Sequence, residues 1–308
     1  MELFLTTLSN DLYSDSRKLL EDSGRNFGIK NIFSYDFAEV ENSDFYRQNK
    51  KIMSNKKYMG YWLWKPYIIS ETLKKMFEGD VLFYIDSGAQ IIEKVDILAR
   101  ICAEQSPIMV FGNANDVNAH WTKRDAFVFM QCDEERYWYS PHADASLFIV
   151  RKCEAGVNFV DEWLKFGADE RIITDASNEC GMPNIAGFVD HRYDQSVLAV
   201  LAQKFQLDLY RMPSQFGNHY KMHQFRVDGE FNCINQMNQK KLKYYSIIPY
   251  YNSPYGQLLN HHRTKNKALI SPVTKENDVQ NIVTDSLFTR LILKKVLGKL
   301  IKLGKLIK

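Results

Sequence analysis

A short apolar segment with one carboxylate behind it limits the folds open to this chain more than any other feature. Val81–Ile85 is a run of five apolar or aromatic residues, and Asp86, Ser87 and Gly88 follow it directly. A strand with apolar residues on both faces is typical of a parallel sheet covered by helices on both sides. Such open sheets bind ligands at the carboxyl ends of their strands. The segment therefore predicts an α/β fold with a ligand site beside Asp86, suited to a phosphorylated ligand and its metal.

Expected strands and helices alternate along most of the chain. Pro66 suits the first turn of a helix because its missing N–H costs nothing there, and Gly79 suits the end of that helix. Residues 126–130 fit either a strand or a helix, and 167–188 fit a polar loop. The alternation favours a Rossmann-like, mainly parallel sheet flanked by helices. The expected strands are 2–8, 31–35, 81–85, 107–111, 145–150 and 207–211, and the expected helices are 15–23, 44–54, 66–77, 91–104, 155–166 and 193–204.

The distribution of charge argues against a polyanion as partner of the main domain. The net charge is +3, but residues 289–308 contain seven basic and no acidic residues. The preceding 288 residues hold the other 33 basic residues and all 37 acidic ones, a net charge of −4. Nucleic acid is therefore not an expected partner. The five cysteines contain no Cys-X-X-Cys pair, which favours reduced thiols in a cytoplasmic protein over a disulfide framework or a zinc site.

The C-terminal segment differs from the rest of the chain. Residues 289–308 fit a helix with leucines on one side and lysines on the other, which suits an anionic membrane surface. The alternative is a helix packed on the main domain or on a second subunit. We favour the membrane, because a wholly cationic polar face matches lipid headgroups. The expected organisation is a domain over 1–270, a linker over 271–288 and this helix, at the inner face of a bacterial plasma membrane, with no membrane-spanning segment and no signal peptide.

Asp86 by itself allows two interpretations. The pyrophosphate of a nucleotide sugar is usually neutralised by Mg²⁺ or Mn²⁺ on oxygen ligands, and an aspartate at a strand end can hold that metal or the ribose hydroxyls. Gly88 would let the backbone approach such a ligand closely. The alternative is an aspartate that caps a helix or a turn. The isolated Asp-Ser-Gly favours the second interpretation, and its context favours the first.

That context is the stretch 60–88, with Gly60-Tyr61-Trp62-Leu63-Trp64-Lys65-Pro66 ahead of the strand. It resembles the core of GT-A glycosyltransferases, in particular bacterial enzymes of capsule and lipopolysaccharide synthesis with a Gly-X-Trp-X-Trp-Lys-Pro signature. Taken alone, both Trp rings would fit the core and Lys65 the surface. The resemblance covers about residues 1–265. It implies that the donor-binding residues are Thr7, Trp62, Trp64, Lys65, Asp86, Ser87, Gly88 and Arg263.

The metal of such enzymes depends on an Asp-X-Asp motif, which this chain has only in part. Asp86-Ser87-Gly88 occupies its place, with glycine where the second acid would be. The resemblance implies Mn²⁺ or Mg²⁺ bound by Asp86 and His262, with Arg263 or Lys265 on the pyrophosphate. The departure at Gly88 leaves the need for a metal open. A rival cluster consists of His219, Lys221 and His223, and Asn260–Lys265 could also be an ordinary polar loop.

Two further segments fit the same resemblance. His142 and Asp144, before the strand 145–150, would bind acceptor hydroxyls, although isolated residues of this kind are usually loop polars. Asp194 and Gln195 open a helix and resemble the pair of retaining galactosyltransferases of lipooligosaccharide synthesis. Asp194 would orient the donor sugar or stabilise the cationic transition state, with Gln195 on the face opposite the leaving group. The alternative for Asp194 is a favourable charge at the helix N-terminus.

The reaction implied is transfer of a hexosyl unit from a nucleoside diphosphate sugar to a hydroxyl of a cell-surface glycan or lipid-linked acceptor, with retention as the weaker part of the prediction. An inverting enzyme with Asp190 or Asp194 as base is one rival. A nucleotide-sugar-binding scaffold without catalysis is another, prompted by the missing second acid. A third is a membrane-surface adaptor whose functional part is residues 289–308.

Overall fold

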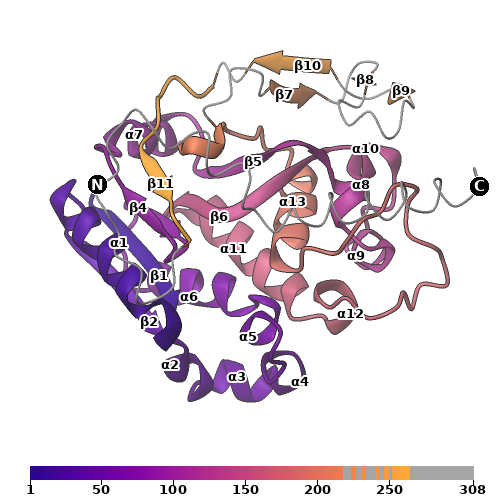
Figure 1. Cartoon of the computed structure of the whole chain (residues 1–308), viewed down its shortest axis with the longest axis horizontal. Coiled ribbons are helices and arrows are strands. Elements are labelled where there is room, and N and C mark those ends of the chain that lie inside the picture. Colours follow the sequence, from indigo (N-terminus) through magenta and orange to yellow (C-terminus); the bar gives the residue numbers. More distant parts are fainter. Residues whose placement is uncertain (218–222, 227–230, 233–240, 243–245, 250–251, 264–308) are drawn as a thin grey trace, which may run out of the picture. The chain divides into compact units, whose positions relative to one another are not determined.

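A computed structural model describes residues 1–217, 223–226, 231–232, 241–242, 246–249 and 252–263 (Figure 1). The predicted linker 271–288 and basic helix 289–308 lie outside the described residues, as do His219, Lys221 and Lys265. The strands are β1 (Leu3–Ser9), β2 (Asn31–Asp36), β3 (Val81–Ile85), β4 (Ala89–Ile91), β5 (Ile108–Val117), β6 (Pro141–Arg151), β7 (His223–Arg226), β8 (Phe231–Asn232), β9 (Lys241–Leu242), β10 (Ser246–Pro249) and β11 (Leu259–His261).

Helices fill most of the chain between these strands. They are α1 (Ser14–Asn26), α2 (Phe37–Glu41), α3 (Asp44–Gln48), α4 (Lys50–Met53), α5 (Tyr58–Tyr61), α6 (Trp64–Leu73), α7 (Asp96–Glu104), α8 (Asn118–Trp121), α9 (Arg124–Phe129), α10 (Glu135–Trp138), α11 (Glu154–Gly167), α12 (Glu170–Ile173) and α13 (Asp194–Lys204), with 3-10 turns η1 (Asp11–Tyr13) and η2 (Gln215–Gly217).

Five strands form the central sheet in the order β2-β1-β3-β6-β5. Strand β1 pairs in parallel with β2 and with β3, while β6 runs antiparallel to both β3 and β5. Four of the five strands therefore point the same way, and the sheet is mainly parallel as predicted. The carboxyl ends of β1 and β3 lie on the same edge, with Thr6 opposite Tyr84. Asp86 leaves the sheet at this edge.

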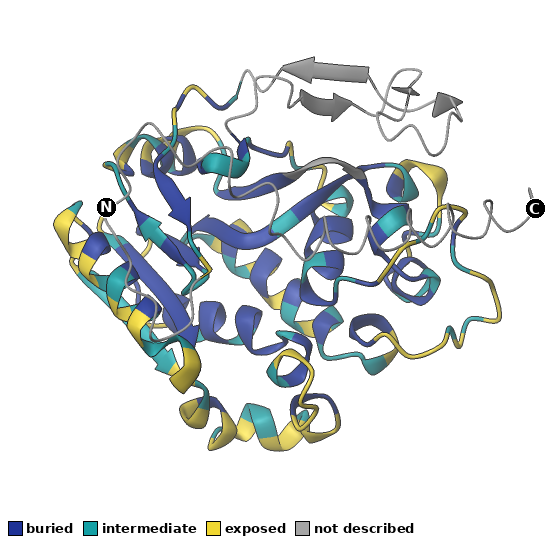
Figure 2. Ribbon diagram, viewed as in Figure 1, coloured by how far each residue is buried: buried dark blue, intermediate teal, exposed yellow. Residues whose placement is uncertain are grey.

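Helices cover both faces of this sheet (Figures 1 and 2). The central strand β3 is therefore shielded from solvent on both sides. All five residues of β3 are buried. Since side chains alternate along a strand, Leu82 and Tyr84 enter one core cluster, while Val81, Phe83 and Ile85 enter the other. Side chains of α6, α11 and α13 complete the first cluster, and side chains of α1 and α7 complete the second. The predicted α/β fold with a sheet buried on both faces is confirmed.

Several predicted element boundaries are wrong. The helix expected over 91–104 begins only at Asp96, because Ala89–Ile91 pairs as a strand with Leu259–His261. The strand expected over 207–211 is reduced to a single bridge between Tyr210 and Phe111. The helix expected over 44–54 is interrupted at Asn49. Residues 126–130, which fitted either a strand or a helix, lie largely in the helix Arg124–Phe129.

No helix in the described part of the chain is both long and apolar enough to cross a bilayer.

Candidate functional site

Asp86 occupies the position that its place after β3 predicts. Its backbone N–H donates to the Ser146 carbonyl, and its own carbonyl accepts from Ala89, so both neighbouring segments fix its backbone. The side chain is 42% exposed, and its Oδ1 accepts a 2.5 Å hydrogen bond from the Tyr84 hydroxyl. Tyr84 lies two residues before Asp86, and side chains two residues apart along a strand point to the same side. One carboxylate at this edge of the sheet is therefore held in place and remains open to solvent.

Lys65 lies beneath that carboxylate in the protein interior. It comes from the first turn of α6, and its side chain is 4% exposed. Its Nζ lies 2.8 Å from Asp194 Oδ2 and 3.6 Å from Asp86 Oδ1, and it donates a 2.9 Å hydrogen bond to the Ala145 carbonyl. Burial alone would lower the pKa of Lys65, but Asp194 and Asp86 reverse this and raise it. The ammonium therefore stays charged and joins two carboxylates that lie 108 residues apart in the sequence.

Asp194 is the buried end of this arrangement. It is the first residue of α13, its side chain is 2% exposed, and its carbonyl accepts from the Trp163 indole N–H at 3.2 Å. Burial raises its pKa to about 6, against the lowering effect of Lys65. Gln195, next in the helix, is half-buried and donates its backbone N–H to Arg192. Asp194 is therefore linked to the exposed Asp86 only indirectly, through the ammonium of Lys65 that pairs with both.

A third acidic residue of the site, Asp144, lies on β6. Asp144 Oδ1 accepts from the Ser146 backbone N–H at 2.7 Å and from the Ser146 hydroxyl at 2.5 Å. That hydroxyl is also 3.4 Å from Nε2 of His261 on β11. Burial raises the pKa of Asp144, but the hydrogen bonds from Ser146 and the neighbouring His261 reverse this and lower it. Burial lowers the pKa of His261 to about 4, so the imidazole is neutral at pH 7 and Asp144 is a carboxylate.

The segment after β11 closes over Gly88. The backbone N–H groups of His262 and Arg263 both donate to the Gly88 carbonyl at 2.9 Å. A Cβ on Gly88 would stand 3.1 Å from the Arg263 Cα, so glycine allows this close approach. Arg263 is exposed, with its guanidinium 5.2 Å from the Phe216 ring centre. The place of a second acid in an Asp-X-Asp motif is thus taken by the backbone of Arg263.

The remaining predicted residues separate into three groups. Thr7 and Trp64 are buried, and neither the Thr7 hydroxyl nor the Trp64 indole N–H has a hydrogen-bond partner among the residues that the structure describes. His142 is also buried, and its Nδ1 lies 3.0 Å from Asn118 Oδ1. Trp62 and Ser87 are half-buried.

The structure brings together Lys65, Asp86 and Asp194 from the predicted set, and it adds three residues that the sequence did not single out. These are Tyr84, Ser146 and His261. Tyr84 could have been found from the sequence, because it lies two residues before Asp86 and side chains at that spacing share one side of a strand. His261 had none, since the pairing of β11 with β4 decides which of two adjacent histidines approaches the carboxylates. The imidazole of His262 hydrogen-bonds the backbone of Ala89 instead.

Asp86 is a candidate metal ligand at this edge of the sheet. Among the described residues, no three His, Cys, Asp or Glu side chains form a group that could hold an ion. Both protein contacts of the Asp86 carboxylate are to Oδ1, which leaves Oδ2 available. Mg²⁺ in phosphate-binding sites commonly takes one or two carboxylates and completes its shell with phosphate oxygens and water. These residues therefore fit a metal carried by a diphosphate ligand, with Asp86 as its protein ligand, better than a metal bound by the protein alone.

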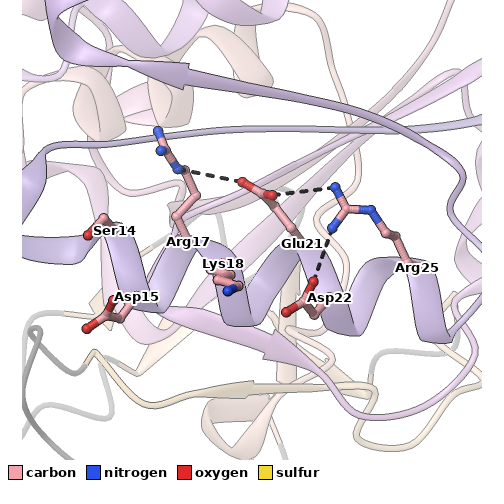
Figure 3. A pocket seen from close by; sticks show the side chains of 7 residues that line it. All are labelled: Ser14, Asp15, Arg17, Lys18, Glu21, Asp22 and Arg25. Carbon is pink, nitrogen blue, oxygen red and sulfur yellow. Dashed lines mark hydrogen bonds and ion pairs between the residues drawn. The ribbon is translucent and has the colours of Figure 1, made fainter.

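A shallow hollow of about 420 Å³ lies elsewhere, along the outer face of α1 (Figure 3). Four of its charged residues pair with one another, since Glu21 pairs with both Arg17 and Arg25, and Arg25 also pairs with Asp22. Such exposed pairs on one helix are ordinary surface features. The hollow therefore does not compete with the edge of β3 as a candidate site.

Comparison with known proteins gives distant similarities. The sequence matches no protein-family model and no curated protein. Among solved structures, the chain is similar to apo WbbM, a bifunctional glycosyltransferase (8% identity, TM-score 0.42), over 69% of this chain and 39% of that one. It is also similar to mouse xyloside xylosyltransferase 1 (9%, 0.43), over 85% and 97% of the two chains. A third is a glycosyltransferase involved in glycosylation of the major capsid of PBCV-1 (10%, 0.35), over 62% and 81%. At such identities and TM-scores the similarity does not assign an activity to this chain.

Proposed function

We propose that the chain is a GT-A-type glycosyltransferase that moves a hexosyl unit from a nucleoside diphosphate sugar to a hydroxyl of a glycan. The observation that carries this proposal is the Asp86 carboxylate, 42% exposed at the carboxyl edge of the sheet and held by Tyr84 and Lys65. A fixed carboxylate at this edge suits a ligand with a diphosphate and hydroxyl groups. The buried ammonium of Lys65 lies 3.6 Å behind it and helps to hold it in place.

Each charged group then has a defined task. Asp86 would hold a Mg²⁺ or Mn²⁺ ion that the donor carries, and such an ion would neutralise the charge of the leaving diphosphate. Arg263 is exposed beside Gly88 and supplies a second cation for the same diphosphate. Lys65 is a positioning residue, because its ammonium is buried against protein oxygens. Asp194 acts through Lys65, and with Gln195 it supports the weaker proposal that the anomeric configuration is retained.

The acceptor side is proposed at Asp144. This carboxylate is half-buried, ionised at neutral pH and oriented by Ser146, so it can accept a hydrogen bond from an acceptor hydroxyl. We propose a cell-surface or lipid-linked glycan as acceptor, and an anionic membrane surface as the partner of residues 289–308. That placement would bring the enzyme to lipid-linked substrates at the inner face of a bacterial membrane.

The proposal is tested with a panel of nucleotide sugars. We expect one of them, with Mn²⁺ or Mg²⁺, to raise the melting temperature, because a ligand that binds only the folded state stabilises it by mass action. The same donor should be hydrolysed slowly, or transferred when acceptor glycans are added, and EDTA should reduce its binding. A chain that binds no nucleotide sugar with or without metal would refute the proposal.

A binding scaffold without catalysis is the second candidate, and the backbone of Arg263 in the place of a second acid favours it. It predicts a thermal shift with a nucleotide sugar but no hydrolysis and no transfer with any acceptor. An adaptor that works through residues 289–308 makes a different prediction. Deletion of those residues would then abolish function, whereas the enzyme would keep its activity on a water-soluble acceptor.

A further inference from the structure

A left-handed turn lies directly before the residues of the site. Tyr58, Met59, Gly60, Tyr61 and Trp62 have φ angles of 50°, 54°, 80°, 57° and 61°. Four of them carry side chains that disfavour this region, and an unbroken run of such residues is rare. Glycine is required at position 60, since a Cβ there would lie 2.7 Å from the Met53 Cα. Tyr193, far along the chain, is also unusual, with φ 53° and ψ −122°.

These two distorted segments bring four aromatic rings together. Tyr58 stacks on Trp62 with 3.9 Å between ring centres and 14° between planes. Tyr193 lies 5.5 Å from Tyr58 and 5.9 Å from Trp62, and Tyr61 lies 5.3 Å from Tyr193. Backbone strain persists where the surroundings hold it, and it concentrates at functional sites. Here it accompanies a cluster of aromatic rings, the aromatic surface, whose most exposed ring, Tyr58, is 46% exposed.

The aromatic surface adjoins the carboxylates. Lys65 Nζ lies 5.8 Å from the centre of the Trp62 ring, and Tyr193 directly precedes Asp194. Because Lys65 contacts both carboxylates, the contacts run in sequence from Arg263 and Gly88 through Asp86 and Lys65 to Asp194 and Tyr193. A diphosphate beside Asp86 and Arg263 would leave the aromatic end for the other substrate.

Polar groups border the aromatic surface. Lys57 forms an ion pair with Asp175, and its Nζ lies 5.1 Å from the centre of the Tyr193 ring. Both charged side chains are partly exposed, at 40% and 37%. A pyranose presents an apolar C–H face and a ring of hydroxyl groups. The face suits a tyrosine stacked on a tryptophan, and the hydroxyls suit a rim that offers both a donor and an acceptor.

We propose that Tyr58 and Trp62, backed by Tyr193 and bordered by Lys57 and Asp175, form a subsite for a pyranose ring of the acceptor. The proposal rests on the glycosyltransferase function proposed above, and it adds a subsite for a sugar ring of the acceptor to the hydroxyl contact proposed at Asp144. It assigns Trp62 to the acceptor, although the sequence resemblance implied the donor.

The test uses ligand-observed NMR of the full chain with methyl glucoside, methyl galactoside and methyl mannoside as probes, with and without UDP. At least one glycoside should bind the wild type. Tyr58→Ala should weaken its binding about tenfold or more, and Tyr58→Phe should retain it because the ring remains. Phe77→Ala is the matched control, since Phe77 is another exposed aromatic, 82% exposed, outside the aromatic surface. Binding of the nucleotide sugar found in the donor screen should be unchanged in all three variants.

Three results would overturn the subsite. They are no binding of any glycoside to the wild type, equal binding to Tyr58→Ala, and loss of donor binding in Tyr58→Ala. Circular dichroism and the melting temperature of each variant guard against misfolding. The two proposals fail separately. If the chain binds a nucleotide sugar but no glycoside, the proposed glycosyltransferase function stands and the subsite is refuted. If it shows Tyr58-dependent glycoside binding but binds no nucleotide sugar, the subsite stands and the proposed function is refuted.

Discussion

Two lysine–aspartate pairs are buried in the described part of the chain, and they differ in what surrounds them. Lys65 and Asp194 are 2.8 Å apart, and Lys123 and Asp125 are 3.3 Å apart. All four side chains are at most 4% exposed. Each lysine also donates a 2.9 Å hydrogen bond to a carbonyl, of Ala145 in one pair and of Ala176 in the other. Burial of an ion pair therefore does not distinguish a site from a structural element here.

The partners of the aspartates do distinguish them. Asp125 accepts from the backbone N–H groups of Glu179 and Cys180 at 2.8 and 2.9 Å. Burial raises the pKa of Asp125, but these hydrogen bonds and Lys123 reverse this and lower it. For Asp194 burial prevails and raises the pKa to about 6. One pair fastens a polar loop to the start of α9, while the other leaves its aspartate less satisfied and continues to the exposed Asp86.

The first prediction compares the two lysines by replacing each with methionine. Lys65→Met leaves Asp194 buried without its cation, so we expect a loss of about 3–5 kcal/mol in the free energy of unfolding at pH 7. Lys123→Met should cost less, about 1–3 kcal/mol, because Asp125 keeps two backbone donors. Urea denaturation of both variants measures the difference. Equal losses would remove the distinction between the two pairs.

The second prediction concerns the pH dependence of stability. The pKa of Asp194 is raised to about 6 in the folded protein, from 3.8. Between the two pKa values, Asp194 is protonated more often in the folded state than in the unfolded state. Its proton uptake therefore favours folding at low pH, and this stabilisation is lost as the pH rises through the folded-state pKa. Two pKa units correspond to roughly 3 kcal/mol. Relative to Asp194→Asn, the wild type should lose stability from about pH 4 to pH 6 and then level off. A parallel pair of stability curves would contradict the raised pKa.

The sequence predicted those parts of the molecule that depend on local pattern. Strand 81–85 was predicted to the residue because its apolar run is flanked by a glycine-ended turn and by Asp86. Lys65, Asp86 and Asp194 were each selected as site residues, and the structure brings them together. The strand expected over 207–211 was wrong because the segment pairs with its neighbour β5 only through one bridge, between Tyr210 and Phe111.

What the sequence could not predict depends on long-range pairing. The approach of His261 to Ser146 follows from the register between β11 and β4, and a shift of one residue would present His262 in its place. The left-handed turn at 58–62 had only Gly60 as a local signal, since its other residues disfavour that conformation. Its stability comes from packing against Met53 and Tyr193, which no local pattern encodes.

The last prediction tests the exposed end of the Lys65 pair. Asp86→Asn keeps the shape of the side chain and removes its charge, so it should lower turnover at least about 100-fold, or about 2.7 kcal/mol, as expected for loss of an electrostatic contact in the transition state. Stability should change little, because the side chain is 42% exposed and Lys65 keeps Asp194 and the Ala145 carbonyl. Asp161→Asn on the exposed face of α11 is the matched control and should leave turnover unchanged. Turnover of the nucleotide sugar identified by the donor screen, followed as released nucleoside diphosphate, gives the measurement. A variant with near-normal turnover would remove Asp86 from the mechanism and make both lysine–aspartate pairs structural.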